Sequence, residues 1–138
     1  MSIFAEKENL FNIYVHFKYV YDEDGNESGI RIIRPENIDE DTVTIEAKAT
    51  GRDYQTLSFI KEDSALINHI TGKPILRTYT LYSSIIIKFF KSWNIYDEET
   101  SQPFPINLEN VNKMHYLLVT SLAKQWLKKT SGKVNYKE

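Results

Sequence analysis

The chain has 138 residues, 41% of them hydrophobic, and a net charge of −2 from 17 basic and 19 acidic side chains. This length predicts a single domain over residues 1–138. The complete absence of cysteine excludes disulfides and thiolate metal sites. The near-neutral charge argues against a nucleic-acid partner. No apolar run approaches the roughly 20 residues of a membrane span, and the charged residues near Met1 do not resemble a signal peptide. We therefore expect no membrane insertion and synthesis in the cytoplasm.

The first part of the chain, residues 1–50, is predicted to be rich in β-strands. Apolar and polar side chains alternate over Leu10–Tyr21 and again over Thr42–Ala49, which is the two-residue period of a half-buried strand. Between them, the polar stretch Asp22–Gly29 predicts a long hairpin tip that leads into a second strand, Ile30–Ile33, closed by Pro35. These segments predict a small, mostly antiparallel sheet.

The second part, residues 51–138, is predicted to be mainly helical. Spacings of three and four residues favour a helix within 52–69, although alternation around Leu57–Lys61 leaves a fourth strand open. A longer helix is predicted over Ile75–Trp93, and a last amphipathic helix over Asn107–Lys129. Together these elements predict an α+β fold, in which two or three helices of the C-terminal half pack on the sheet.

Two prolines predict a rigid break between the last two helices. Pro103 and Pro105 cannot donate helix hydrogen bonds, and each favours extended geometry in the residue before it. Asn107 is then placed to cap the last helix, with Glu109 in its first turn. The stretch Lys88–Asn110 thus reads as helix, hinge and helix.

This stretch resembles a segment of short proteins from tailed-phage structural gene clusters, which are often labelled tail assembly or virion proteins. Those proteins carry a Trp-Asn/Asp-aliphatic-x-Asp-Glu segment, then Pro-x-Pro-aliphatic-Thr/Asn, then Glu-Asn. Here Glu99 and Thr100 replace the glycine that is usual after the acidic pair, and the loop is longer. The residues that match are Trp93, Asn94, Ile95, Asp97, Glu98, Pro103, Pro105, Ile106, Asn107, Glu109 and Asn110.

The sequence does not indicate a catalytic, cofactor-binding or metal site. Asp22, Asp24 and Asn26 imitate the start of a calcium loop, but Glu27 and Ile33 stand where that loop needs glycine and a bidentate acid. We therefore interpret this segment as a solvated hairpin tip. The three histidines lack metal-ligand spacing, and neither a nucleophile elbow nor a glycine-rich phosphate loop occurs. We expect no cofactor and no enzymatic activity.

One face of the first strand carries Tyr14, His16 and Lys18 at two-residue steps. Such a ladder can stack bases, but the chain lacks the basic surface that single-strand binders use. We interpret the ladder as a solvent-facing surface, or as one that a partner subunit covers.

The resemblance and the 13% aromatic content together predict a non-enzymatic phage protein that acts through protein contacts. It would work in the host cytoplasm or be incorporated into the virion, as a tail or connector component or a tail assembly chaperone. Its expected partners are other virion proteins or copies of itself in a homo-oligomer. The alternative is an inhibitor or adaptor that binds a host protein through the acidic stretches Asp22–Glu27 and Asp97–Glu99. The residues expected at the partner contact are Tyr14, Tyr19, Trp93, Tyr96 and Phe104.

Overall fold

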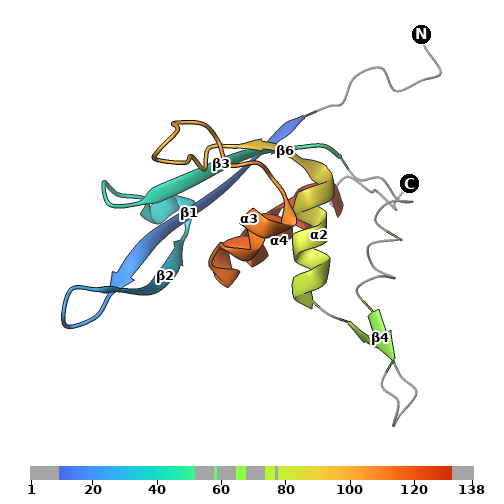
Figure 1. Cartoon of the computed structure of the whole chain (residues 1–138), viewed down its shortest axis with the longest axis horizontal. Helices are drawn as coiled ribbons and strands as arrows, with labels where there is room; N and C mark the ends of the chain where they lie inside the picture. Colours follow the sequence, from blue (N-terminus) through green and yellow to red (C-terminus); the bar gives the residue numbers. More distant parts are fainter. Residues whose placement is uncertain (1–9, 52–57, 59–64, 68–73, 77, 132–138) are drawn as a thin grey trace.

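The computed structural model describes residues 10–51, 58, 65–67, 74–76 and 78–131. In these residues the fold is α+β, as the sequence predicts. A four-stranded antiparallel sheet has the order β2-β1-β3-β6, and three helices of the C-terminal half pack on one side of it (Figure 1).

The three strands predicted in the first part are confirmed. They are β1 (Phe11–Tyr21), β2 (Glu27–Ile33) and β3 (Val43–Ala49), with β1 in the middle. β2 pairs with His16–Tyr21 of β1, whereas β3 pairs with Phe11–Phe17. The two neighbours of β1 are therefore offset along it, and they overlap only near its centre.

The tip between β1 and β2 is held by its own polar side chains. A carboxylate oxygen of Asp22 accepts hydrogen bonds from the backbone amides of Asp24 and Asn26, each at 2.9 Å. Gly25 has φ +83°, which suits a residue without a Cβ atom. This local chemistry explains why the polar stretch makes a turn at this point, and it assigns one oxygen of Asp22 to the backbone.

The predicted helix over Ile75–Trp93 is wrong at both ends. The helix α2 covers Thr78–Phe89; Pro74–Leu76 forms the short strand β5, and Phe90–Trp93 forms β6. β6 pairs with Ala47–Ala49 of β3 and completes the sheet. The four-residue spacing that suggested a helix is overridden here, because pairing with the open edge of β3 satisfies the backbone of β6. The hinge therefore joins a strand to a helix.

The last predicted helix is two helices. Asn107 caps α3 (Leu108–Asn112) as expected, because its side-chain oxygen accepts from the backbone amide of Asn110 at 2.9 Å. A turn then separates α3 from α4 (Tyr116–Ser131). In a continuous helix the carbonyl of Val111 would accept from residue 115, but it accepts from Met114 at 3.1 Å and from the Tyr79 hydroxyl at 3.5 Å. These competing bonds accompany the break.

The prediction for residues 52–69 lies mostly outside the described residues. Ser58 is helical, but Ala65–Ile67 forms β4, which pairs antiparallel with β5. At residues 65–67 the predicted helix is therefore wrong.

The core lies between the sheet and α2 and α4. Trp126 of α4 is fully buried, donates its indole N–H to the carbonyl of Thr50 at 2.8 Å, and stacks on Phe89 with ring centroids 4.4 Å apart. It therefore ties α4 to both the sheet and α2. None of the helices in the described residues is long and apolar enough to cross a membrane.

Candidate protein-contact surfaces

The loop between β6 and α3, residues 94–107, carries two of the five predicted contact residues, Tyr96 and Phe104, and a third, Trp93, is the last residue of β6. Tyr96 forms an antiparallel bridge with Pro103, and the amide of Phe104 donates to the carbonyl of Ile95 at 2.8 Å. The loop is thus a small hairpin of its own. Tyr96 is 55% exposed near its start, where a partner could reach it.

Trp93, the last residue of β6, anchors this loop to the core. Its side chain is only 5% exposed, and its indole N–H donates to the carbonyl of Phe104 at 2.7 Å. Trp93, Ile95, half-buried Phe104 and Met114 line a small apolar cavity of about 170 Å³. Trp93 is therefore covered by its own chain, and Tyr96 is the most exposed of Trp93, Tyr96 and Phe104.

The other two predicted contact residues lie on opposite faces of β1. Tyr14 is on the face away from the helices, in line with His16 and Lys18, whereas Tyr19 is on the same face as buried Phe17. The fold therefore does not bring Tyr14 and Tyr19 together, nor does either belong to the loop that carries Tyr96. The five residues belong to at least three separate places.

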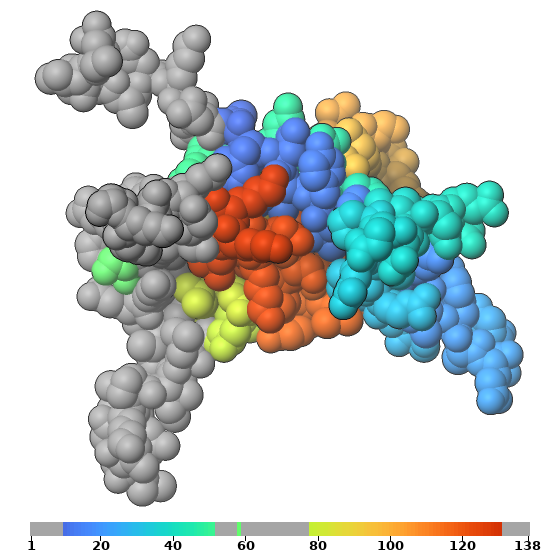
Figure 2. All heavy atoms as spheres, turned by 180° about the vertical axis from the view of Figure 1, so that it is seen from behind, coloured from blue at the N-terminus to red at the C-terminus, as the bar shows by residue number. Residues whose placement is uncertain are grey.

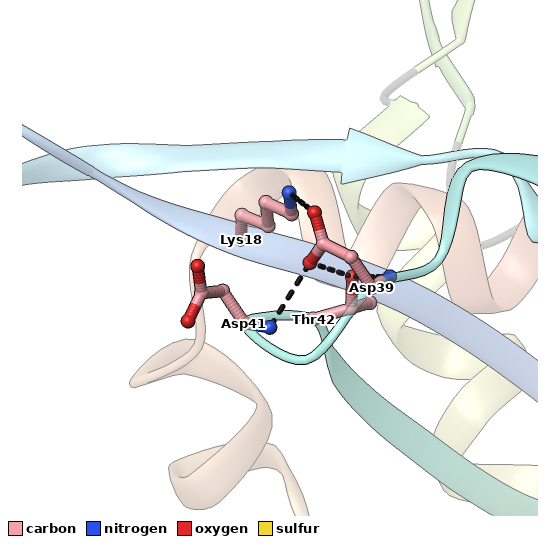
Figure 3. A network of polar contacts seen from close by, with 4 residues as sticks. All are labelled: Lys18, Asp39, Asp41 and Thr42. Atoms are coloured by element: carbon pink, nitrogen blue, oxygen red, sulfur yellow. Dashed lines mark hydrogen bonds and ion pairs between the residues drawn. The ribbon is translucent and has the colours of Figure 1, made fainter.

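Polar contacts occupy the ladder of Tyr14, His16 and Lys18. The rings of Tyr14 and His16 are nearly parallel, with centroids 6.4 Å apart, and His16 Nδ1 lies 2.8 Å from the Thr44 hydroxyl. Lys18 forms an ion pair with Asp39 (Figure 3). The hydrogen bond from Lys18 lowers the pKa of Asp39, helped by the amide of Asp41 and the hydroxyl of Thr42. This face is held by side chains from two strands and a loop.

A row of paired apolar side chains crosses the core face of the sheet at Phe17. In an antiparallel ladder, directly paired residues point to the same face. Phe17 pairs with Ile32 of β2 on one side and with Val43 of β3 on the other, and its ring meets that of Tyr19 edge-on at 5.4 Å. Phe17 is buried, but Ile32, Val43 and Tyr19 are 38%, 38% and 42% exposed. We call these four residues the open sheet end.

The open sheet end continues the core face of the sheet. Further along the same strands, Val15 and Ile45 are paired with each other and are only 3% and 4% exposed, because the helices cover them. The hairpin tip projects beyond the helices in Figure 1. The loop between α3 and α4 reaches it through His115, whose Nε2 lies 3.2 Å from a carboxylate oxygen of Glu27.

A second apolar surface lies between α2 and α3. Tyr79 stacks on Tyr116 with centroids 5.9 Å apart, and its hydroxyl donates to the side-chain oxygen of Asn112 at 2.7 Å. Burial raises the pKa of Tyr79. Beside it is an open cavity of about 460 Å³, also lined by Ile87 and Leu108. Leu108 and Tyr116 are each 53% exposed.

Sequence reasoning missed Ile32 and Val43 as surface residues, together with the pair of Tyr79 and Tyr116. Alternation assigns Ile32 and Val43 to a face of the sheet, but it does not show how far the helices extend along that face. That both residues pair with Phe17 follows only from the register of the three strands β1, β2 and β3. Among the described residues, no group of three acidic or histidine side chains could hold a metal ion.

No family model, no curated protein and no solved structure matches this chain, so its function is inferred from the residues and surfaces described above.

Proposed function

We propose that this chain is a non-enzymatic structural or assembly protein of a tailed phage, and that it acts by binding other proteins. The observation that carries the binding part of the proposal is the open sheet end. Monomeric proteins commonly expose single apolar side chains, but several part-exposed apolar side chains grouped around one buried ring on a sheet face are typical of an interaction surface.

The open sheet end has the composition and shape of a contact surface. Phe17 and Tyr19 form a rigid aromatic pair, flanked by two β-branched side chains on neighbouring strands. Aromatic side chains bury a large area at a low entropic cost, which is why they are enriched at interface centres. A partner that covers Tyr19, Ile32 and Val43 would complete the layer that the helices begin.

The phage part of the proposal rests on the resemblance of the segment from Trp93 to Asn110. In this chain the segment forms the anchored hairpin loop and the capped start of α3. It presents Tyr96 at the surface and carries no catalytic grouping that we recognise. A role as a tail or connector component, or as a tail assembly chaperone, accounts for both features.

The test begins with light scattering of the purified chain over a concentration series, compared with its monomer mass of 16.2 kDa. An antibody against the chain is then used to probe purified particles of the source phage. A defined oligomer, or incorporation into particles, is expected. A strict monomer that is absent from both particles and assembly intermediates would refute the phage assembly role.

Two matched variants examine the surface itself. Val43 and Val20 are both strand valines, 38% and 39% exposed, but Val20 is on the opposite face of the sheet. Val43→Lys is expected to weaken self-association or partner binding by about tenfold or more, since it places a charge in the buried centre of the interface. Val20→Lys is expected to leave binding unchanged. Equal effects of the two variants would show that the open sheet end is not the contact.

The alternative proposal is a small inhibitor or adaptor that binds a host protein through the acidic tip. The projection of this tip in Figure 1 favours it. Neutralising Glu23 and Asp24 together leaves the turn-forming carboxylate of Asp22 in place. If this double variant loses a host partner while Val43→Lys retains it, the adaptor role replaces the assembly role.

A further inference from the structure

Before His16, one edge of β1 has no strand partner among the described residues. β3 pairs with all of Phe11–Phe17, but β2 pairs only from His16 onward. The reason lies in the sequence after β2. Pro35 has no backbone N–H to extend the ladder and begins the short 3-10 helix η1 (Pro35–Asn37), which ends the strand.

The orientation of the β1 backbone identifies which groups face this edge. The carbonyl of Asn12 accepts a hydrogen bond at 2.7 Å from the side-chain ammonium of Lys129 in α4, so it points away from β3. Backbone groups of a strand alternate in direction. The N–H and C=O of Tyr14 therefore point to the same side as those of Asn12, and no described residue pairs with Tyr14 there.

A groove runs along this edge. Its volume is about 270 Å³, and its walls are formed by β1 at Tyr14 and His16, by the end of β2 with Pro35, and by α4 at Lys124 and Lys128. In Figure 2, α4 in red lies against β1 in blue, and the cyan segment that follows β2 lies on the other side. No acidic side chain lines the groove in the described part of the chain.

The groove thus combines an unpaired strand edge with lysines. Exposed strand edges bind extended peptides through backbone hydrogen bonds, while pockets beside them select alternate side chains. The unpaired edge from Asn12 to Val15 is about 13 Å long, which is enough to pair with roughly four residues of an incoming strand. A lysine close to an open edge also discourages pairing with unsuitable chains.

We propose that this groove binds an extended acidic segment of a partner protein, which adds to the sheet as a strand beside β1. On binding, the ammonium of Lys129 releases the carbonyl of Asn12 and donates instead to a carboxylate of the partner. Lys124 contacts a second carboxylate of the partner. The proposal rests on the proposed function, because it gives the chemistry of one protein partner.

The charge distribution distinguishes this partner from a second copy of the chain. If the β1 edges of two copies paired, the lysines at positions 124 and 129 of one copy would approach the corresponding lysines of the other copy. Like charges at an interface disfavour such pairing. An acidic segment has no such penalty. The same lysines that oppose self-pairing therefore favour a partner of opposite charge.

The experiment selects random seven-residue peptides from a display library on the immobilised full chain. We expect the enriched peptides to carry Asp or Glu at alternate positions. The best peptide, added to the full chain, is expected to slow hydrogen exchange at the Tyr14 amide, which strand addition would bond. A selection without acidic alternation, or a bound peptide that leaves the Tyr14 amide unprotected, overturns the proposal. If raising the protein concentration without peptide already slows exchange at this amide, two copies of the chain pair with each other, and this outcome also overturns the proposal.

A matched pair of charge reversals completes the test. Lys124→Glu is expected to weaken peptide binding by about tenfold at low salt, because the reversal turns an attraction into a repulsion. Lys113→Glu makes the same charge change away from the groove, at an exposed lysine paired with Glu109, and is expected to have little effect. Equal losses in both variants overturn the proposal. Because Val43→Lys examines the open sheet end separately, a failure here is distinguishable from a failure of the proposed function.

Discussion

Replacing Trp93 by phenylalanine measures how firmly the loop of residues 94–107 is anchored. The substitution removes the indole N–H that donates to the carbonyl of Phe104 at 2.7 Å, and it shortens a side chain that is only 5% exposed. Leaving this part-buried carbonyl without its donor costs about 1–2 kcal/mol. The smaller ring leaves packing defects worth about 1 kcal/mol more. We therefore expect Trp93→Phe to lower the free energy of unfolding by about 2–3 kcal/mol.

Urea unfolding, followed by the fluorescence of the remaining Trp126, measures this change. The control is Tyr96→Phe, at a side chain that is 55% exposed on the same loop; it is expected to change the free energy of unfolding by less than about 0.5 kcal/mol. A loss below about 0.5 kcal/mol for Trp93→Phe itself would refute the reasoning, since the carbonyl of Phe104 would then be satisfied by water.

Three further predictions follow from polar contacts elsewhere. Lys18 lowers the pKa of Asp39, so their ion pair stabilises the fold at pH values above the ordinary carboxylate pKa, and this stabilisation is lost as the pH falls through the lowered pKa. Lys18→Met should therefore raise the pKa of Asp39 in an NMR titration, and an unchanged pKa would contradict the ion pair. Asn107→Ala should cost about 1 kcal/mol in chemical unfolding, since it removes the cap of α3, and no loss would show that the cap is dispensable. The buried hydroxyl of Thr120 has no partner among the described residues, so Thr120→Val should raise the melting temperature; a lower one would indicate an unseen partner.

The N-terminal strands could be predicted because their signal is local. Ile13, Val15 and Phe17 alternate with polar residues, and burial on one face requires this period. The cap at Asn107 was equally predictable, because the hydrogen bond that it makes spans only three residues.

The errors occurred where partners distant in the sequence decide the structure. Phe89 and Trp93 are four residues apart, which suits a helix, but Trp93 pairs with Ala47 in the sheet. The break before α4 likewise involves Tyr79, which lies far from Val111 in the sequence and bonds its carbonyl. Neither partner is visible in the local pattern.

The candidate site was only partly predictable for the same reason. Tyr19 is predicted as a contact residue from its residue type and its place in an alternating strand. Its neighbours in the open sheet end, Ile32 and Val43, became visible only through the strand register. The lysines of the groove belong to a helix that approaches β1 only in the folded chain, so their positions did not indicate a binding edge.

The late arrival of β6 has a consequence for synthesis. β3 ends at Ala49, but its partner strand ends at Trp93, so the ribosome adds about 45 residues between them. At elongation rates of about 5–20 residues per second this takes roughly 2 to 9 s. During that interval one edge of β3 has no partner among the described residues, and Trp126, whose indole N–H bonds the carbonyl of Thr50, has not yet been made. The nascent chain therefore exposes an unpaired strand edge for seconds, long enough for a chaperone to bind it before the sheet closes.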